Sequence, residues 1–207
     1  MIEFRNIAKS FSEKFLLKDF SMIIGDNEKV QISGKSGIGK STIFRMMLGF
    51  DWPDQGDILL DGVRMDETNC WEFRKQIAYV SQDLQIGTGP VEQMMQDTWK
   101  LRSNLHVQKD AKGKLYELLD LFELNRDILK QPIEKLSGGE KQRIAIINAL
   151  ILQRKYLLLD EFSSALDAKM KQIVFDYLMS QHDKTVIFIS HDFLNHQPGF
   201  RIITLES

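Results

Sequence analysis

The sequence predicts an α/β fold with three parts: a largely parallel sheet core, an antiparallel β subdomain and an inserted helical subdomain. Short, nearly continuous apolar strands such as YLLLD at 156–160 and TVIFIS at 185–190 suit a sheet that is covered on both faces. Helical segments alternate with these strands, as they do in α/β proteins. Between them, residues 87–126 are rich in helix formers, with apolar residues three and four positions apart.

Composition favours one globular domain. The chain has 207 residues, is 43% hydrophobic and carries a formal net charge of −2. This length and apolar content fit a single domain with a substantial core, for which we take residues 1–207. The charge balance argues against nucleic acid as the main partner, because nucleic-acid binders usually show a basic excess. A lone cysteine, Cys70, excludes an internal disulfide framework and fits a reducing compartment.

No segment predicts insertion into a membrane. Charges at Glu3 and Arg5 stand where a secretory signal needs apolar residues. The most apolar stretch, residues 144–152, is too short to cross a bilayer. We therefore expect that a separate polypeptide supplies any membrane function.

The first part of the chain predicts strands around a glycine-rich loop. The expected elements are an alternating strand from Ile2, a strand over 15–24, a turn at 25–28, a strand over 29–33, a helix over 40–48 and a strand over 57–60. Asp61-Gly62 predicts a tight turn after the last of these strands.

The second part adds the helical insertion and then returns to α/β alternation. After a helix carrying Ile144, Ile147 and Ile151, the expected elements are a strand over 155–160, a helix over 167–180, a strand over 185–190 and a strand over 202–205. We expect residues 1–86 and 155–207 to form one lobe and residues 87–154 to form a helical lobe.

The strongest motif is a phosphate-binding loop between the strand at 29–33 and the helix at 40–48. It consists of Gly34, Lys35, Ser36, Gly37, Ile38, Gly39, Lys40, Ser41 and Thr42. Glycines allow successive backbone N–H groups to face one anion, and the helix dipole adds to the attraction. Lys40 is expected to reach the β- and γ-phosphates, and the Ser41 hydroxyl is placed to bind Mg²⁺. The flanking strand and helix argue against the alternative of a flexible Gly/Ser linker.

Two adjacent carboxylates end the strand at 156–160. The carboxyl ends of strands are where ligands bind in open α/β sheets. Asp160 is expected to hold Mg²⁺, and Glu161 to orient and deprotonate the attacking water. A solvated strand end is the alternative for this pair on its own, and the phosphate-binding loop argues against it.

A third motif, Leu136-Ser137-Gly138-Gly139-Glu140, begins a helix. Backbone N–H groups and the Ser137 hydroxyl make a second anion site. Ser137 and Glu140 also have the spacing of a helix capping box, and both interpretations can hold together. In order and spacing with the other two motifs, this segment resembles the signature of ATP-binding cassette (ABC) proteins, and the resemblance covers the chain from residue 2 to about 205.

The resemblance implies roles for further residues. Gln82 is similar to the glutamine that approaches Mg²⁺ and water, and His191 to the switch histidine that contacts the γ-phosphate. Residues 164–167 resemble the D-loop at the dimer interface, and Phe11 stands where an aromatic usually stacks on adenine. Phe162 departs from the family, which commonly has proline at this position; proline would fix φ, whereas phenylalanine can anchor the segment only by packing.

The resemblance also implies a mechanism and partners. ATP is expected to lie between two cassettes arranged head to tail, in a homodimer or with a second cassette, so that Ser137, Gly138 and Gly139 of one face the phosphate loop of the other. The chain is expected to hydrolyse ATP with Mg²⁺ and to drive transport through separate permease subunits at the cytoplasmic face of the plasma membrane. The alternatives are a soluble ABC-type ATPase linked to nucleic acid or ribosomes, and a nucleotide-binding scaffold without turnover.

Overall fold

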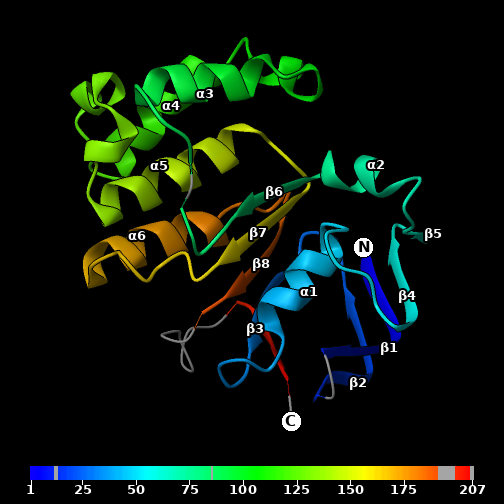
Figure 1. The fold of residues 1–207 in the computed structure, drawn as a ribbon. Helices are drawn as coiled ribbons and strands as arrows, with labels where there is room; N and C mark the ends of the chain where they lie inside the picture. The colour runs from blue at the N-terminus through cyan, green and yellow to red at the C-terminus, as the bar shows by residue number, and fades with distance from the viewer. Residues whose placement is uncertain (12–13, 85, 191–198, 206–207) are drawn as a thin grey trace.

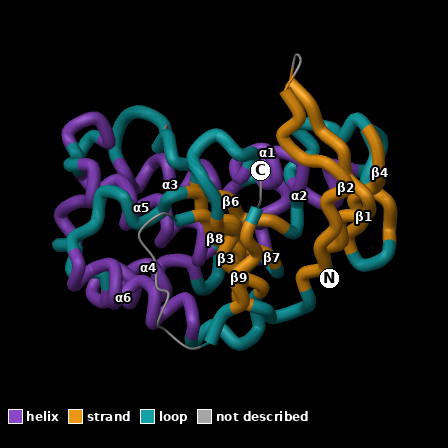
Figure 2. Tube along the Cα trace, turned by 90° about the horizontal axis from the view of Figure 1, so that it is seen from below, coloured by secondary structure: helices purple, strands orange, loops and turns teal. Residues whose placement is uncertain are grey.

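The computed structural model describes residues 1–11, 14–84, 86–190 and 199–205. Within these residues the chain forms a parallel sheet, an antiparallel sheet and a layer of helices (Figure 1). Figure 2 shows the antiparallel sheet on one side of the parallel sheet and helices α3 to α6 on the other. These observations confirm the predicted α/β fold with an antiparallel part and a helical part.

The parallel sheet has the strand order β6-β7-β8-β3-β9, and every neighbouring pair in it is parallel. Its strands are β3 (Lys29–Ser33), β6 (Ile77–Val80), β7 (Tyr156–Asp160), β8 (Thr185–Ile189) and β9 (Arg201–Thr204). Since parallel strands end at the same edge, the segments after β3, β6 and β7 all emerge at one edge of the sheet. That edge carries the candidate site.

The antiparallel sheet has the order β2-β1-β4-β5. Its strands are β1 (Ile2–Phe11), β2 (Lys14–Ile24), β4 (Gln55–Leu60) and β5 (Val63–Arg64). Asp61 and Gly62 both have positive φ, 50° and 80°, as the predicted two-residue turn between β4 and β5 requires.

The helices account for the remaining regular structure of the described residues. They are α1 (Lys40–Met47), α2 (Cys70–Arg74), α3 (Val91–Lys100), α4 (Ala111–Leu121), α5 (Gly138–Ile151) and α6 (Ala168–Met179), with 3-10 helices η1 (Arg102–Val107), η2 (Arg126–Lys130) and η3 (Ile133–Lys135). Helix α2 has five residues, too few to show a helical period, and the sequence did not predict it. None of the helices in these ranges is long and apolar enough to cross a membrane.

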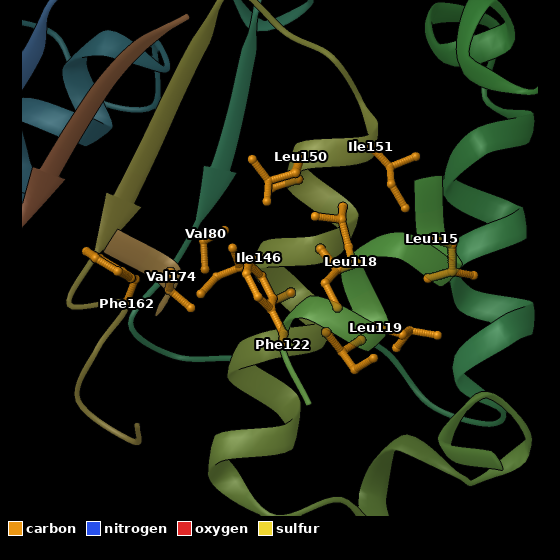
Figure 3. Packing of buried hydrophobic residues seen from close by; sticks show 14 of the residues in the cluster. Val80, Leu115, Leu118, Leu119, Phe122, Ile146, Leu150, Ile151, Phe162 and Val174 are labelled. Carbon is orange, nitrogen blue, oxygen red and sulfur yellow. The ribbon is translucent and has the colours of Figure 1, made fainter. Parts of the chain in front are cut away.

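Side chains of the parallel sheet alternate between two hydrophobic clusters. In β7, Tyr156 and Leu158 pack in the cluster that contains α1, whereas Leu157 and Leu159 pack in the cluster that contains α5 and α6. Figure 3 shows part of this second cluster, with Phe162 at its sheet side and Phe122 toward the helical part. Helix α1 and helix α5 therefore cover opposite faces of one sheet.

Candidate nucleotide-binding and catalytic site

The phosphate-binding loop joins β3 to α1 in a conformation that only glycine adopts readily. Gly34, Gly37 and Gly39 have φ of 149°, 73° and 112°. A Cβ at Gly34 would also lie 3.1 Å from the Leu205 carbonyl oxygen. Gly39 caps α1 without any side-chain hydrogen bond, and the first turn of α1 holds no acidic residue. The N–H groups of that turn are thus open to an anion.

Lys40 lies inside this loop and closes it. Its side chain is buried, and Nζ donates to the carbonyl oxygens of Gly34 at 2.8 Å and Lys35 at 3.0 Å. Burial lowers the pKa of Lys40, and the neighbouring carboxylates of Glu161 and Asp160 oppose that shift. A cation facing two carboxylates and a cluster of N–H groups is suited to bind and polarise a polyphosphate.

Asp160 ends β7 in a buried position beside Ser41. Its side chain is 3% exposed, and no described residue hydrogen-bonds its Oδ1. Burial raises the pKa of Asp160, while the hydrogen bond with the Ser41 side chain acts in the opposite direction. The predicted pair of Mg²⁺ ligands is therefore brought together, with a carboxylate oxygen left for a further partner.

Glu161 and Gln82 meet at the ends of adjacent strands. Gln82 Nε2 donates to Glu161 Oε2 at 3.0 Å, although the residues are 79 positions apart. This contact follows from the pairing of β6 with β7, whose carboxyl ends lie together. Gln82 is exposed and Glu161 partly exposed, so a water molecule can reach both side chains.

Sequence reasoning missed Tyr79, which lies beside Asp160. Its hydroxyl is 3.5 Å from Asp160 Oδ2, and its ring stands edge-on to Phe44 of α1, with centroids 6.1 Å apart. Burial, with Asp160 as a further cause, raises the pKa of Tyr79 to about 12, so it remains a neutral donor. The signal available was a tyrosine in an otherwise apolar strand that runs beside the Asp160 strand.

The signature segment lies apart from the phosphate-binding loop. Ser137 caps α5, on the opposite face of the sheet from α1, and its hydroxyl is occupied by a capping box with Glu140. Glu140 Oε2 accepts from the Ser137 N–H and from its hydroxyl, both at 2.8 Å. A Cβ at Gly139 would lie 2.9 Å from the Ala165 carbonyl oxygen, so glycine lets residues 164–167 approach this helix start.

Of the two remaining candidates, only Phe11 lies in the described part of the chain. Phe11 ends β1 with its ring 52% exposed and the Lys9 Nζ 5.4 Å from its centroid. The facing strand β2 carries Leu16, whose Cβ would lie 3.6 Å from a Cβ at Gly39, so this hairpin end adjoins the phosphate-binding loop. His191 lies outside the described residues.

A parallel sheet that gathers a phosphate-binding loop, a buried aspartate and a Gln–Glu pair at one edge defines a P-loop nucleotide hydrolase with a cassette-type signature helix. The family model for ABC transporters matches residues 17–164. The chain therefore belongs to the ABC transporter family.

Its relatives are ATP-binding proteins of transporters. The energy-coupling factor transporter ATP-binding protein EcfA1 of Oceanobacillus iheyensis is 31% identical over 100% of this chain, which spans 76% of that relative. The spermidine/putrescine import ATP-binding protein PotA of Protochlamydia amoebophila is 35% identical over 92% of this chain. The sulfate/thiosulfate import ATP-binding protein CysA of a Synechocystis species is 34% identical over 90%. The matches to PotA and CysA span about half of those relatives, 51% and 52%.

Solved structures agree with this assignment. A bacterial Atm1-family ABC exporter with ATP bound superposes with a TM-score of 0.84 at 27% identity, over 99% of this chain and 37% of the exporter chain. The cassette MJ0796, solved as a dimer in a post-hydrolysis state with ADP and Pi, gives 0.80 at 27% identity, over 100% of this chain and 94% of its own. This chain is thus an ABC-type ATPase, as the sequence predicted.

Proposed function

We propose that this cassette hydrolyses MgATP at a site completed by a second cassette, and that it drives solute transport through separate transmembrane subunits. The observation that carries the proposal is the division of the site. Lys40, Asp160 and Glu161 converge at one sheet edge, whereas Ser137 caps a helix on the opposite face. A γ-phosphate on the phosphate-binding loop therefore needs the signature segment of another copy.

Mg²⁺ fits the residues beside the phosphate-binding loop. The Asp160 Oδ1 atom is buried, and no described residue hydrogen-bonds it; the Ser41 hydroxyl contacts the same carboxylate. Oxygen ligands in small number suit Mg²⁺, which keeps several waters and binds phosphate oxygens. We assign Ser41 and Asp160 as its protein ligands, with Gln82 nearby. When bound, Mg²⁺ neutralises charge on the β- and γ-phosphates.

The other residues divide the work of hydrolysis. Backbone N–H groups from Gly34 to Thr42 hold the phosphates, and Lys40 balances their charge. Glu161 takes a proton from water, and Gln82, 3.0 Å from its carboxylate, orients that water and the base. We retain His191 as a γ-phosphate contact and Phe11 as the adenine platform, the latter supported by its exposure at the end of a hairpin whose other strand contacts Gly39 through Leu16.

The membrane partner is proposed to dock in a groove of about 900 Å³ between the two lobes. Apolar and cationic side chains line it together, among them Trp71, Ile77, Leu101, Leu152, Arg74, Lys75, Arg102 and Arg154. Trp71 and Leu101 are 64% and 57% exposed at its rim. This lining suits an amphipathic helix with acidic residues, presented by a transmembrane subunit.

Arg74 links the groove to α1, at the end of that helix opposite the phosphate-binding loop. Its guanidinium stacks against Phe50 and Trp71, 4.6 and 4.9 Å from their ring centroids. It also donates to the Gly49 carbonyl oxygen at 2.8 Å, just beyond the end of α1. We propose that residues 1–207 act as one domain, with a helical lobe over 87–154, docked on its permease at the cytoplasmic face of the plasma membrane.

Glu161→Gln tests the proposed chemistry. The amide cannot accept the proton from water, so hydrolysis should fall about 100-fold or more, while Mg-dependent ATP binding stays near the wild-type affinity. ATP should then trap a dimer. Phosphate release measures the loss of hydrolysis, and sedimentation with ATP detects the dimer. Glu67→Gln, an acidic residue near α2 outside the site, is the control and should behave as wild type. Wild-type turnover by Glu161→Gln would remove Glu161 from the role of base.

Leu101→Glu tests the docking groove. A carboxylate in place of an exposed apolar side chain should reduce the amount of transmembrane subunit that copurifies with the chain, relative to wild type. ATP hydrolysis by the isolated cassette should be unchanged. Ile23→Glu is a matched control, because Ile23 is 53% exposed on the antiparallel sheet. Equal loss of the complex in both variants would place the docking surface elsewhere.

A further inference from the structure

We propose that Phe162 is a positioning residue for Glu161: its buried ring holds the turn that presents the Glu161 carboxylate to Gln82. The inference rests on the proposed role of Glu161 as the base. It assigns to side-chain packing a constraint that proline commonly supplies at this place in the family.

Phe162 is fixed by aromatic neighbours on its own side of the sheet. Its side chain is 0% exposed, and its ring stands edge-on to Phe188 of β8, with centroids 6.0 Å apart at 83°. Phe188 in turn packs edge-on against Phe175 and Phe200, at 6.2 and 5.5 Å. Figure 3 shows Phe162 beside Val174 of α6, at the sheet side of the cluster. Rings in such a cluster have little freedom to move.

Glu161 has an unfavourable backbone conformation that its neighbours must maintain. Its φ is 46°, in the left-handed region that residues other than glycine rarely adopt. Its N–H donates to the Ile189 carbonyl oxygen at 3.0 Å, and its own carbonyl oxygen accepts from the Ser164 N–H at 3.1 Å. Strained residues persist where the surrounding structure fixes them, and they concentrate at functional sites.

The two residues that flank Glu161 are both buried, on the two faces of the sheet. Asp160 is 3% exposed beside the Ser41 side chain, and Phe162 fills the cluster that contains α5 and α6. Glu161 lies between these two anchors, only partly exposed, with its Oε2 held 3.0 Å from Gln82 Nε2. Loss of the Phe162 ring would free one anchor, letting Glu161 relax toward ordinary φ and turn its carboxylate away from the attacking water.

Phe162→Ala and Phe162→Leu, each made with Glu161 and with Glu161→Gln, test this inference. Phe122→Ala is the matched control: Phe122 is also 0% exposed, with Tyr177 edge-on at 6.0 Å, but it lies in the helical part, apart from Phe162 (Figure 3). All variants are assayed below their melting temperatures, by steady-state kcat and KM for ATP and by single-turnover phosphate release.

We expect Phe162→Ala to lower kcat about 10- to 100-fold with little change in KM, because the misplaced group is the base and not the phosphate-binding loop. Phe162→Leu, which keeps most of the apolar volume, should lose less than about threefold. In the Glu161→Gln chain, Phe162→Ala should change the residual turnover by less than about twofold, since the group through which it acts is gone. Phe122→Ala should lower the melting temperature while leaving kcat within about twofold.

The same factor of loss from Phe162→Ala in both backgrounds, or a matching loss of kcat from Phe122→Ala, would overturn the positioning role. If Phe162→Ala does not fold, Phe162→Val, which removes less of the ring volume, takes its place in the same comparison of backgrounds, and a loss of kcat below about twofold with Glu161 present would overturn the role. A normal turnover by Glu161→Gln alone would instead refute the base assignment, so the two failures are distinguishable.

Discussion

The phosphate-binding loop and the signature segment each lead into a helix, but they leave its N-terminus in opposite states. Gly39 caps α1 without a side-chain bond, and no acidic residue stands in the first turn. Ser137 caps α5 with a complete capping box, and the Glu140 carboxylate stands in the first turn. The first helix start is open to an anion, whereas the second is already satisfied by its own chain.

Because of this difference, the phosphate-binding loop can bind an anion within one chain, whereas the signature segment depends on a partner. Lys40 provides a cation where α1 begins, while Glu140 places a negative charge where α5 begins. An isolated cassette should thus hold ATP by its phosphate-binding loop alone. The signature helix should bind a γ-phosphate only when a second copy brings ATP to it on its own phosphate-binding loop. The Ser137 hydroxyl must then turn from Glu140 to the phosphate.

The largest effect should come from removing Lys40, the cation of the phosphate-binding loop. Lys40→Ala deletes two hydrogen bonds that close the loop and the charge that faces the phosphates. ATP affinity should fall roughly 10- to 100-fold, as for loss of a charged hydrogen bond, and hydrolysis should become undetectable. Titration with a fluorescent ATP analogue measures the affinity. Lys35→Ala, an exposed lysine of the same loop, should retain affinity within about threefold; a comparable loss there would mean that net charge, not the position of Lys40, holds ATP.

Ser137→Ala should weaken phosphate binding by the signature segment without affecting the phosphate-binding loop. The variant loses the helix cap, which costs about 1 kcal/mol of the free energy of unfolding, and the hydroxyl offered across the dimer. ATP affinity of the monomer should be unchanged, while the ATP-trapped dimer of the Glu161→Gln chain should dissociate about tenfold more readily. Sedimentation with ATP measures this. Asn125→Ala removes a cap of the same kind, on η2 (2.9 Å to the Asp127 N–H), and should reduce stability without changing dimer affinity.

The phosphate-binding loop could be predicted from the sequence more fully than the site that a second cassette completes. The loop from Gly34 to Thr42 shows its chemistry locally, and β3 has the bounds predicted for it, Lys29–Ser33. The capping box of Ser137 and Glu140 was also predicted from spacing and is present. These features need only a few consecutive residues, and so local sequence rules are sufficient for them.

Contacts between neighbouring strands could not be predicted from the sequence in the same way. The Gln82–Glu161 hydrogen bond and the position of Tyr79 beside Asp160 depend on β6 lying next to β7, which is a matter of strand order. Strand order depends on long-range packing of both faces, so it leaves no local signal. The anchoring of Phe162 is similar: its possible packing was foreseen, but its partner Phe188 lies on another strand.

The smallest effects should be opposite changes of stability with pH, caused by Asp160 beside Ser41 of α1 and by Glu140 in the first turn of α5. Burial raises the pKa of Asp160 above its ordinary 3.8, whereas hydrogen bonds from Ser137 lower the pKa of Glu140 below its ordinary 4.5. An acid with a raised pKa costs stability once pH rises above its unfolded value. An acid with a lowered pKa adds stability above its unfolded value and loses it as pH falls through the folded one.

Asp160→Asn should therefore raise the melting temperature by a few degrees near neutral pH. This gain should shrink as pH falls through the raised folded pKa and vanish below pH 3.8, where the carboxyl is protonated in both the folded and the unfolded chain. Glu140→Gln should lower the melting temperature by about 1–4 °C near neutral pH, as for loss of half to one kcal/mol of capping, and this loss should fade below pH 4.5. Thermal unfolding followed across this range measures both differences from wild type. Melting shifts of the same sign in the two variants would contradict the comparison. MgATP supplies the decisive control: it should stabilise the wild-type chain and Glu140→Gln more than Asp160→Asn, because only Asp160 belongs to the proposed metal site.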